Sequence, residues 1–269
     1  MNQRFRICLL LCLFSLSIFA QPAKTIVSLS PSLTKMVYLL QAQNQLVGCT
    51  SYCDEAIKDH KAIVSSAMEV NIEKVLLLKP DMVITTKFTK PSTIEALKKM
   101  GLKVEIFSQP ASFMEICEQL VTLGSITGKQ ILAQGIVDKQ KERMAKVKER
   151  IKNKPKPKIF MEIGAKPLFS ATPNTFMGDF IQYAGGTNIA SDLTIGTISR
   201  ESVLLRNPDV IVIVTMGIVA SEEKTNWTAY KELNATKTGR IFVIDSNKSC
   251  SPTPIDFADV VEEMVNNIY

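Results

Sequence analysis

The chain has 269 residues, which is enough for one large domain or two domains of ordinary size. Hydrophobic residues make up 46% of it, so the chain can bury substantial cores and does not belong to the disordered class. The formal net charge is +6, but the basic run at residues 139–158 contains no interleaved aromatic residue, so we interpret it as a solvated surface rather than a nucleic-acid-binding element.

Residues 1–20 have the pattern of an export signal. Arg4 and Arg6 supply positive charge, residues 7–13 begin an apolar segment too short to span a membrane, and Ala20 offers a small residue for cleavage. Cleavage near Ala20 removes two arginines and no acidic residue, which lowers the formal charge from +6 to +4. We therefore expect an exported, soluble mature chain.

Strand and helix patterns alternate through residues 21–126. Ser30 and Pro31 are typical of a helix start, as the cap and the first helical residue. The predicted elements are a strand at 25–29, a helix from residue 30, a strand at 46–49, a helix and then a strand within 71–84, a helix at 92–100, a strand at 102–107 and a helix at 112–123. This alternation predicts an N-terminal α/β lobe with a parallel sheet.

Residues 71–84 recur in similar form as residues 199–212. The matched positions, each 128 residues apart, are Asn71 with Ser199, Glu73 with Glu201, Pro80 with Pro208 and Asp81 with Asp209. In each copy an oxygen-bearing residue can cap a helix, a carboxylate follows in the first turn, and Pro-Asp ends the helix before an apolar β-branched strand. Two copies in register predict two similar lobes.

Residues 127–153 differ in kind from the regions on either side. The segment carries an apolar stripe formed by Ile136, Val137, Met144, Val147 and Ile151. Glu142 and Lys146 are spaced to pair one turn apart on the charged face. A single helix over residues 127–152 would be about 39 Å long at ~1.5 Å per residue. Because it lies between the two repeat copies, we expect this helix to link the lobes.

Residues 154–269 are predicted to form a second α/β lobe on the same plan. Its predicted elements are a strand at 158–163, a helix at 175–183 closed by two glycines, the second repeat copy, a strand at 240–245 and a final helix at 255–268. Trp227, the single tryptophan, lies near Tyr230, and we interpret it as a packing residue rather than a ligand-stacking one.

Motifs for catalysis and metal binding receive little support. Residues 124–130 fall one position short of a phosphate loop, and His60 alone cannot supply an imidazole cluster. Residues 32–35 match Ser-x-x-Lys and residues 237–239 match Lys-Thr-Gly of penicillin-binding enzymes, but the middle Ser-Asp-Asn element is absent. We expect no catalytic and no metal-binding residues, and a serine acyl-enzyme using Ser32 is the alternative from another class.

The mature chain has four cysteines. Cys117 lies among the apolar positions of a predicted helix, which favours a buried thiol. Cys49 ends a predicted strand, whereas Cys53 and Cys250 lie in loops that follow strands and so border the ligand crevice of an open α/β sheet. Export permits disulfides. A disulfide, reactive thiols and plain loop residues all remain open for these three.

Several motifs together resemble one family. Residues 26–34 read Ile-Val-Ser-Leu-Ser-Pro-Ser-Leu-Thr, residues 46–54 read Leu-Val-Gly-Cys-Thr-Ser-Tyr-Cys-Asp, and residues 184–190 read Ala-Gly-Gly-Thr-Asn-Ile-Ala. With both repeat copies, these motifs resemble the periplasmic cobalamin- and iron-chelate-binding proteins of ABC importers, and the cobalamin branch most closely. The resemblance covers essentially the whole mature chain. It implies an α/β fold of two Rossmann-like lobes with parallel sheets, joined by one long α-helix.

The resemblance also implies roles for particular residues. Glu73 and Glu201 match two lobe-tip carboxylates that dock onto arginines of the membrane permease, although carboxylates at these positions also suit a helix N-terminus. Tyr52 matches a cleft tyrosine that packs on the corrin. The chain departs from the cobalamin-binding pattern where Ala67 and residues 194–197 replace cleft tryptophans, and where the arginine-containing loop near the C-terminus reads Cys-Ser-Pro-Thr-Pro.

We therefore expect a periplasmic, monomeric binding protein without enzymatic activity or cofactor, which captures a corrinoid between its lobes and delivers it to an ABC importer. A ferric siderophore or haem is the alternative ligand. The expected ligand contacts are the side chains of Tyr52, Cys53, Met68, Phe88, Phe169, Met216 and Cys250.

Overall fold

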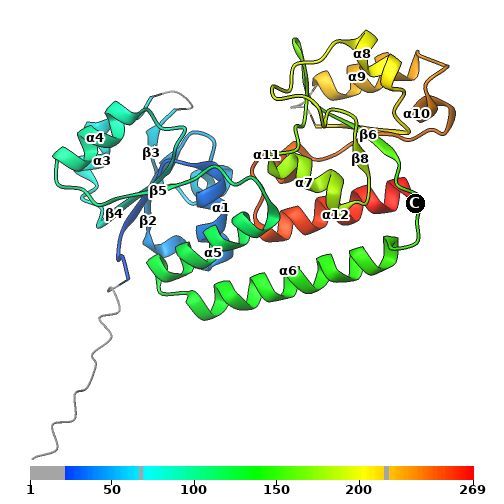
Figure 1. Cartoon of the computed structure of the whole chain (residues 1–269). Helices are drawn as coiled ribbons and strands as arrows, with labels where there is room; N and C mark the ends of the chain where they lie inside the picture. Colours follow the sequence, from blue (N-terminus) through cyan, green and yellow to red (C-terminus); the bar gives the residue numbers. More distant parts are fainter. Residues whose placement is uncertain (1–21, 67–68, 215–217) are drawn as a thin grey trace, which may run out of the picture.

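The structure, a computed structural model, describes residues 22–66, 69–214 and 218–269. The predicted signal, residues 1–20 with its cleavage site, lies outside them. Two α/β lobes lie side by side, and one long helix runs beneath both (Figure 1). In the described part of the chain, no helix is long and apolar enough to cross a membrane.

The N-terminal lobe is built on five parallel strands in the order β3-β2-β1-β4-β5. The strands are β1 (Ile26–Ser28), β2 (Leu46–Thr50), β3 (Ala62–Ser65), β4 (Met82–Thr86) and β5 (Val104–Phe107). Val27 of β1 lies opposite Val83 of β4, and both are fully buried. The parallel sheet predicted from the alternation of elements is confirmed, and β3 is an additional strand.

Helices cover both faces of this sheet. They are α1 (Pro31–Leu39), the 3-10 helix η1 (Gln43–Gln45), α2 (Asp54–Lys58), α3 (Ile72–Leu77), α4 (Pro91–Lys99) and α5 (Phe113–Thr127). α1 and α5 lie on one face and α3 and α4 on the other (Figure 1). Leu33 of α1 and Leu120 of α5 belong to one core, and Val75 of α3 and Leu97 of α4 to the other. Because adjacent residues of a strand point to opposite faces, the same short strands supply both cores.

The C-terminal lobe repeats the parallel plan, except for one strand. Its sheet has the order β10-β9-β6-β7, with β8 also paired to β6. The strands are β6 (Lys158–Ala165), β7 (Leu168–Ser170), β8 (Thr187–Asn188), β9 (Val210–Ile213) and β10 (Ile241–Val243). β7 is antiparallel to β6 because only Lys166 and Pro167 connect them, and a parallel crossover needs about a dozen residues or more.

The helices of this lobe include the C-terminal one, which also contacts the other lobe. They are α7 (Phe176–Tyr183), α8 (Arg200–Arg206), α9 (Ile218–Thr228), α10 (Asn234–Lys237), α11 (Ser246–Cys250) and α12 (Pro254–Ile268). Phe257 of α12 packs against Phe180 of α7 and Phe113 of α5, with ring centroids 4.5 and 4.9 Å away. This aromatic contact joins the two lobes through their cores.

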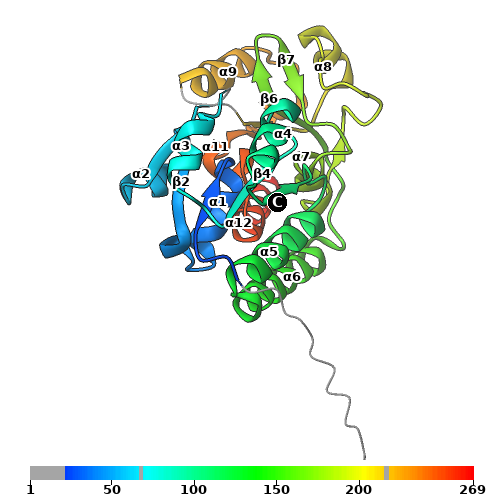
Figure 2. The same ribbon diagram turned by 90° about the vertical axis from the view of Figure 1, so that its left-hand side faces the viewer.

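The linking helix is α6 (Gln130–Ile151), three residues shorter at its start than predicted. Gly128 adopts a left-handed conformation, with φ of 71°, and ends α5 at Thr127. α6 then runs for 22 residues, about 33 Å at ~1.5 Å per residue, and packs against α5 and α12 (Figure 2). Arg143 of α6 donates to Glu262 and Asp259 of α12 at 2.7–2.9 Å, which fixes the helix to the C-terminal lobe.

The predicted stripe and ion pair of this helix are present. Val137, Met144 and Val147 are buried, and Lys146 Nζ lies 2.7 Å from Glu142 Oε1. The pair is exposed, so it adds little to stability. The periodicity thus gave the correct buried face although the helix start was misplaced.

The two repeat copies have the same local structure. In α3 the Asn71 side chain accepts a hydrogen bond from the Lys74 amide, and in α8 Ser199 accepts one from the Ser202 amide. Each helix is followed by a left-handed residue, Lys79 and Asn207, with φ of 46° and 45°. The capped helices predicted from the repeat are confirmed.

The repeated aspartate has a structural role that the sequence did not indicate. Asp81 Oδ2 accepts from the backbone amides of Lys24 and Thr25, at 2.9 and 2.8 Å, just before β1. Asp209 Oδ2 accepts from the amide of Lys158, at 2.9 Å, where β6 begins. In both lobes the aspartate therefore fixes the entry of a central strand.

Candidate ligand site between the lobes

A cavity of about 460 Å³ opens at the carboxyl ends of β1, β2 and β4. This edge is where open parallel sheets bind ligands, because the loops that follow the strands diverge there. The described residues that line it include Leu29, Ser30, Ser32, Thr50, Tyr52, Ser65, Ser66, Val70, Thr86, Phe88, Thr89, Lys90, Thr93, Gln109, Cys250 and Ser251. Cys250 and Ser251 come from the C-terminal lobe, so both lobes contribute.

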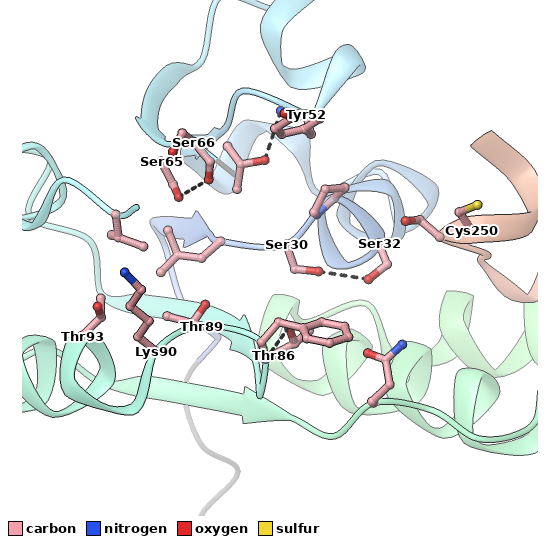
Figure 3. A pocket seen from close by; sticks show the side chains of 17 residues that line it. Ser30, Ser32, Tyr52, Ser65, Ser66, Thr86, Thr89, Lys90, Thr93 and Cys250 are labelled. Atoms are coloured by element: carbon pink, nitrogen blue, oxygen red, sulfur yellow. Dashed lines mark hydrogen bonds between the residues drawn. The ribbon is translucent and has the colours of Figure 1, made fainter. Parts of the chain in front are cut away.

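The floor of the cavity is rich in hydroxyl groups (Figure 3). Ser30 Oγ and Ser32 Oγ lie 3.0 Å apart, and Thr50 Oγ1 accepts from the Tyr52 amide at 3.2 Å. Lys90, at the start of α4, is the only charged side chain among the described lining residues. A hydroxyl both donates and accepts, so such a floor suits the amide or carboxylate substituents of a ligand.

Two aromatic side chains at this cavity are largely exposed in the described structure. Tyr52 follows β2 and is 60% exposed, and Phe88 follows β4 and is 81% exposed. Exposed aromatic surface of this size beside polar groups is characteristic of a binding site.

A second cavity, of about 700 Å³, adjoins the first. The two share Pro31, Tyr52, Cys250 and Ser251. The second cavity lies between α1 and α2 on one side and α11 and α12 on the other, and its charged lining residues are Lys35, Asp54, Glu55, Lys58, Asp245, Lys248 and Asp256. Together the two cavities offer room for a ligand much larger than a single ion or amino acid.

Three of the residues expected to contact ligand line the first cavity: Tyr52, Phe88 and Cys250. Cys53 does not. It is buried beneath the loop, with its Sγ atom 3.2 Å from both Thr34 Oγ1 and Thr50 Oγ1.

The remaining expected contacts are Phe169, Met68 and Met216. Phe169 lies on β7 of the C-terminal lobe and lines neither cavity as the described residues define them. Met68 and Met216 fall outside the described residues. The sequence did not single out the hydroxyl-bearing floor or Lys90, because serine and threonine after a strand are equally typical of ordinary helix caps and turns.

All four cysteines of the described chain are free thiols. Cys117 is buried as predicted, and burial raises its pKa to about 12. The neighbouring Cys49 thiol lowers the pKa of Cys53 below its usual value, against the opposing effect of burial. Cys250 is exposed at the cavity, whereas Cys53 is buried in the N-terminal lobe.

The expected docking carboxylates lie away from the cavities. Glu73 is on α3 and Glu201 is on α8, one in each lobe, and both are exposed. α3 and α8 both lie away from the linking helix α6 (Figure 1). Backbone and side-chain hydrogen bonds at the start of α8, including one from Ser199, hold the pKa of Glu201 below its usual value.

A buried polar cluster lies next to this second carboxylate. Arg200, the neighbour of Glu201, pairs with the buried Glu223 of α9 and lies 4.5 Å above the ring of Trp227. Trp227 is fully buried and packs against Phe160, so the interpretation of this tryptophan as a packing residue is confirmed.

The residues of the acyl-enzyme alternative have other partners. Lys35 Nζ donates to the carbonyl oxygens of Asn247 and Ser251 on the opposite lobe, and Lys237 pairs with Glu232 at 2.9 Å. His60 is an exposed residue after α2. Among the described residues, no cluster of histidine, cysteine and acidic side chains is suited to hold a metal ion.

The fold and the interlobe site define a class of transport protein. A family model described as periplasmic binding protein matches residues 26–248, and the chain belongs to this family. It is therefore a substrate-binding protein of the ABC importer type.

Two relatives with similar sequences carry different names. An uncharacterized ABC transporter substrate-binding lipoprotein of Bacillus subtilis is 29% identical over 259 residues, which cover 91% of this chain and 80% of that protein. A vitamin B12-binding protein of Yersinia pseudotuberculosis is 27% identical over 213 residues, 77% of this chain and 75% of that protein.

Among solved structures, a possible iron-binding periplasmic solute-binding protein of Staphylococcus epidermidis superimposes with a TM-score of 0.80 at 26% identity, over 93% of this chain and 100% of that one. The expected fold of two α/β lobes with parallel sheets and a long linking helix is thereby confirmed.

Proposed function

We propose that the protein captures a corrinoid of the cobalamin class between its lobes and delivers it to an ABC importer. The observation that carries the proposal is the pair of exposed rings, Tyr52 and Phe88, beside a hydroxyl-rich floor. A corrinoid is a large ring with an apolar face and amide substituents at its edge. The rings offer surface for the face, and the hydroxyls offer partners for the amides.

The size of the site supports a ligand of this class. The two cavities measure about 460 and 700 Å³ and adjoin at Tyr52 and Cys250. A ligand that spans both would touch the two lobes at once, and its affinity would come from burial between preformed surfaces. The vitamin B12-binding relative from Yersinia supports the same choice.

An iron chelate is the second candidate. It is favoured by the similarity to the possible iron-binding protein from Staphylococcus and by Lys90, whose charge suits a ferric siderophore or haem with acidic groups. The hydroxyl groups of the floor suit both candidate ligands, because a hydroxyl can form hydrogen bonds with an amide or with a carboxylate.

Titration calorimetry tests the proposal directly. The purified mature chain is titrated with cobalamin, cobinamide, haemin and a set of ferric siderophores. We expect tight binding of a corrinoid. No heat with either corrinoid, together with saturable binding of an iron chelate, would replace the first candidate by the second.

We further propose that Glu73 and Glu201 dock onto basic residues of the importer's membrane subunits. One carboxylate stands exposed on each lobe, at the same position of the repeat and away from the cavities. A partner with two equivalent basic sites would engage both at once, and like charges at such a contact would cost several kcal/mol. The exported, periplasmic location expected from residues 1–20 is consistent with this role.

A further inference from the structure

The two repeat copies share more than their carboxylates. Leu77 of α3 and Leu205 of α8 are 79% and 87% exposed, and they occupy the same repeat position, 128 residues apart. Each leucine follows its glutamate, Glu73 or Glu201, by four positions. Residues four apart lie on the same side of a helix, so each lobe presents a carboxylate and a leucine side by side.

The rest of each helix is arranged so that this face stays outward. Val75 and Val203 are fully buried in the two cores, and Leu76 and Leu204 are half-buried at matching positions. The two valines therefore supply core contacts of the two helices, whereas Leu77 and Leu205 are not part of either core. A single exposed leucine is ordinary on a protein surface, but the same exposure at the same position in both lobes is not explained by packing.

We infer that Leu77 and Leu205 are apolar docking contacts, and that the partner presents two equivalent sites, each with a basic side chain beside an apolar hollow. The inference rests on the proposed docking role of Glu73 and Glu201 and adds the chemistry of their neighbours. The occupant is the pair of membrane subunits of the importer, because a duplicated surface fits a partner with two like copies. The carboxylate gives orientation and the leucine, once covered, gives affinity.

The test compares polar substitutions at three exposed positions. Leu77→Gln and Leu205→Gln remove the apolar surface and keep a good helix former. Ile131→Gln is the matched control, since Ile131 is 92% exposed on α6, a helix that carries neither docking carboxylate. Because all three side chains are solvated, the melting temperature of each variant should stay within a degree or two of the original.

Binding to the complete cognate importer, reconstituted in nanodiscs, is measured by biolayer interferometry in the absence of ligand. We expect each leucine variant to weaken binding about tenfold or more, and the double variant to weaken it further. Ile131→Gln should bind as the original protein does. The double variant Leu77→Met with Leu205→Met keeps apolar side chains at both positions and should retain most of the affinity for the importer.

Glu73→Arg with Glu201→Arg in the same assay separates two kinds of failure. If this variant loses binding while the glutamine variants bind normally, the leucine inference is wrong and the docking carboxylates stand. If neither pair of substitutions changes binding, the docking role of both helices is overturned. Equal weakening by Ile131→Gln would also overturn the inference, because the effect would then not belong to the repeated face.

Discussion

The indole nitrogen of Trp227 lies 2.5 Å from Oε2 of Glu162, a fully buried carboxyl on the central strand β6. Its other oxygen, Oε1, has no hydrogen-bond partner in the described structure. Burial, with the Glu223 carboxylate nearby, raises the pKa of Glu162 from 4.5 to about 7 although Trp227 and Arg200 act to lower it. A proton on Glu162 would give the unpaired oxygen a donor toward Glu223, so the folded state favours the neutral form.

The first prediction is a stability that falls as the pH rises through this range. Below about pH 4.5 the folded and unfolded chains both hold the proton. At higher pH the unfolded chain releases it first, so the free energy of unfolding drops as the pH rises toward the raised pKa of the folded state. Above pH 7 the loss is complete. Glu162→Gln keeps the bond to Trp227 and should remove this contribution.

Urea denaturation at pH 5 and pH 8 checks the prediction. The stability advantage of the variant over the original protein should be larger at pH 8 than at pH 5. Groups that do not contact Glu162 titrate equally in both proteins, so the difference between the two pH dependences reports Glu162 together with its neighbour Glu223. Parallel pH profiles for the two proteins would contradict a raised pKa at Glu162.

The second prediction concerns Tyr52. Because its ring is 60% exposed, Tyr52→Ala should leave the melting temperature nearly unchanged. The loss of ring contact should weaken corrinoid binding by about ten- to a hundredfold in calorimetry. Tyr52→Phe keeps the ring and should retain most of the affinity. Unaltered corrinoid binding by Tyr52→Ala would show that Tyr52 does not contact the ligand.

The third prediction separates docking from helix stabilisation at the repeated carboxylates. Glu73→Arg with Glu201→Arg should leave ligand affinity nearly unchanged, since neither side chain lines a cavity. Stimulation of the importer's ATPase should be abolished, with a partial loss for either single reversal. If the carboxylates only favour their helix starts, the result should instead be a small drop in melting temperature with normal stimulation.

The fourth prediction concerns the thiols. In the native protein a maleimide should label Cys250 and leave Cys49, Cys53 and Cys117 unlabelled, because those three are buried. Cys53 should stay protected although its pKa is lowered, because the reagent cannot reach a buried thiol.

Non-reducing peptide mapping of the exported protein completes this test. We expect Cys53 and Cys250 as separate free thiols, and slower labelling of Cys250 when the cleft is filled by cobalamin. Cys250→Ser should abolish native labelling. A disulfide-linked peptide pair containing Cys53 and Cys250 would contradict this prediction and would support the disulfide that the sequence allowed.

Short-range signals explain why much of the fold could be predicted. The caps Asn71 and Ser199 act on amides three residues away, and the buried stripe of α6 follows from helical spacing alone. Where such signals were weak, the prediction failed. Helix α2 was not predicted, and Gly128 ended α5 inside a segment that otherwise reads as one helix.

The candidate site was less predictable than the fold. Cys250 was placed at the cleft because it follows a strand, and Tyr52 because it matches a cleft tyrosine of the family. The argument from the preceding strand failed for Cys53, which turns inward to Thr34 and Thr50. Which side of a loop a residue faces depends on the packing of neighbouring elements rather than on its position after a strand.

The sequence by itself determined the two-lobe plan, because a repeat with matched caps, carboxylates and strands encodes the same αβ unit twice through local interactions. Only the tertiary structure decided which residues meet across long separations. Glu162, Arg200 and Glu223 form one buried cluster, and Cys250 joins Tyr52 at the cavity, although these residues are far apart in the chain. Such contacts arise when separate elements pack together, and no local pattern records which elements will do so.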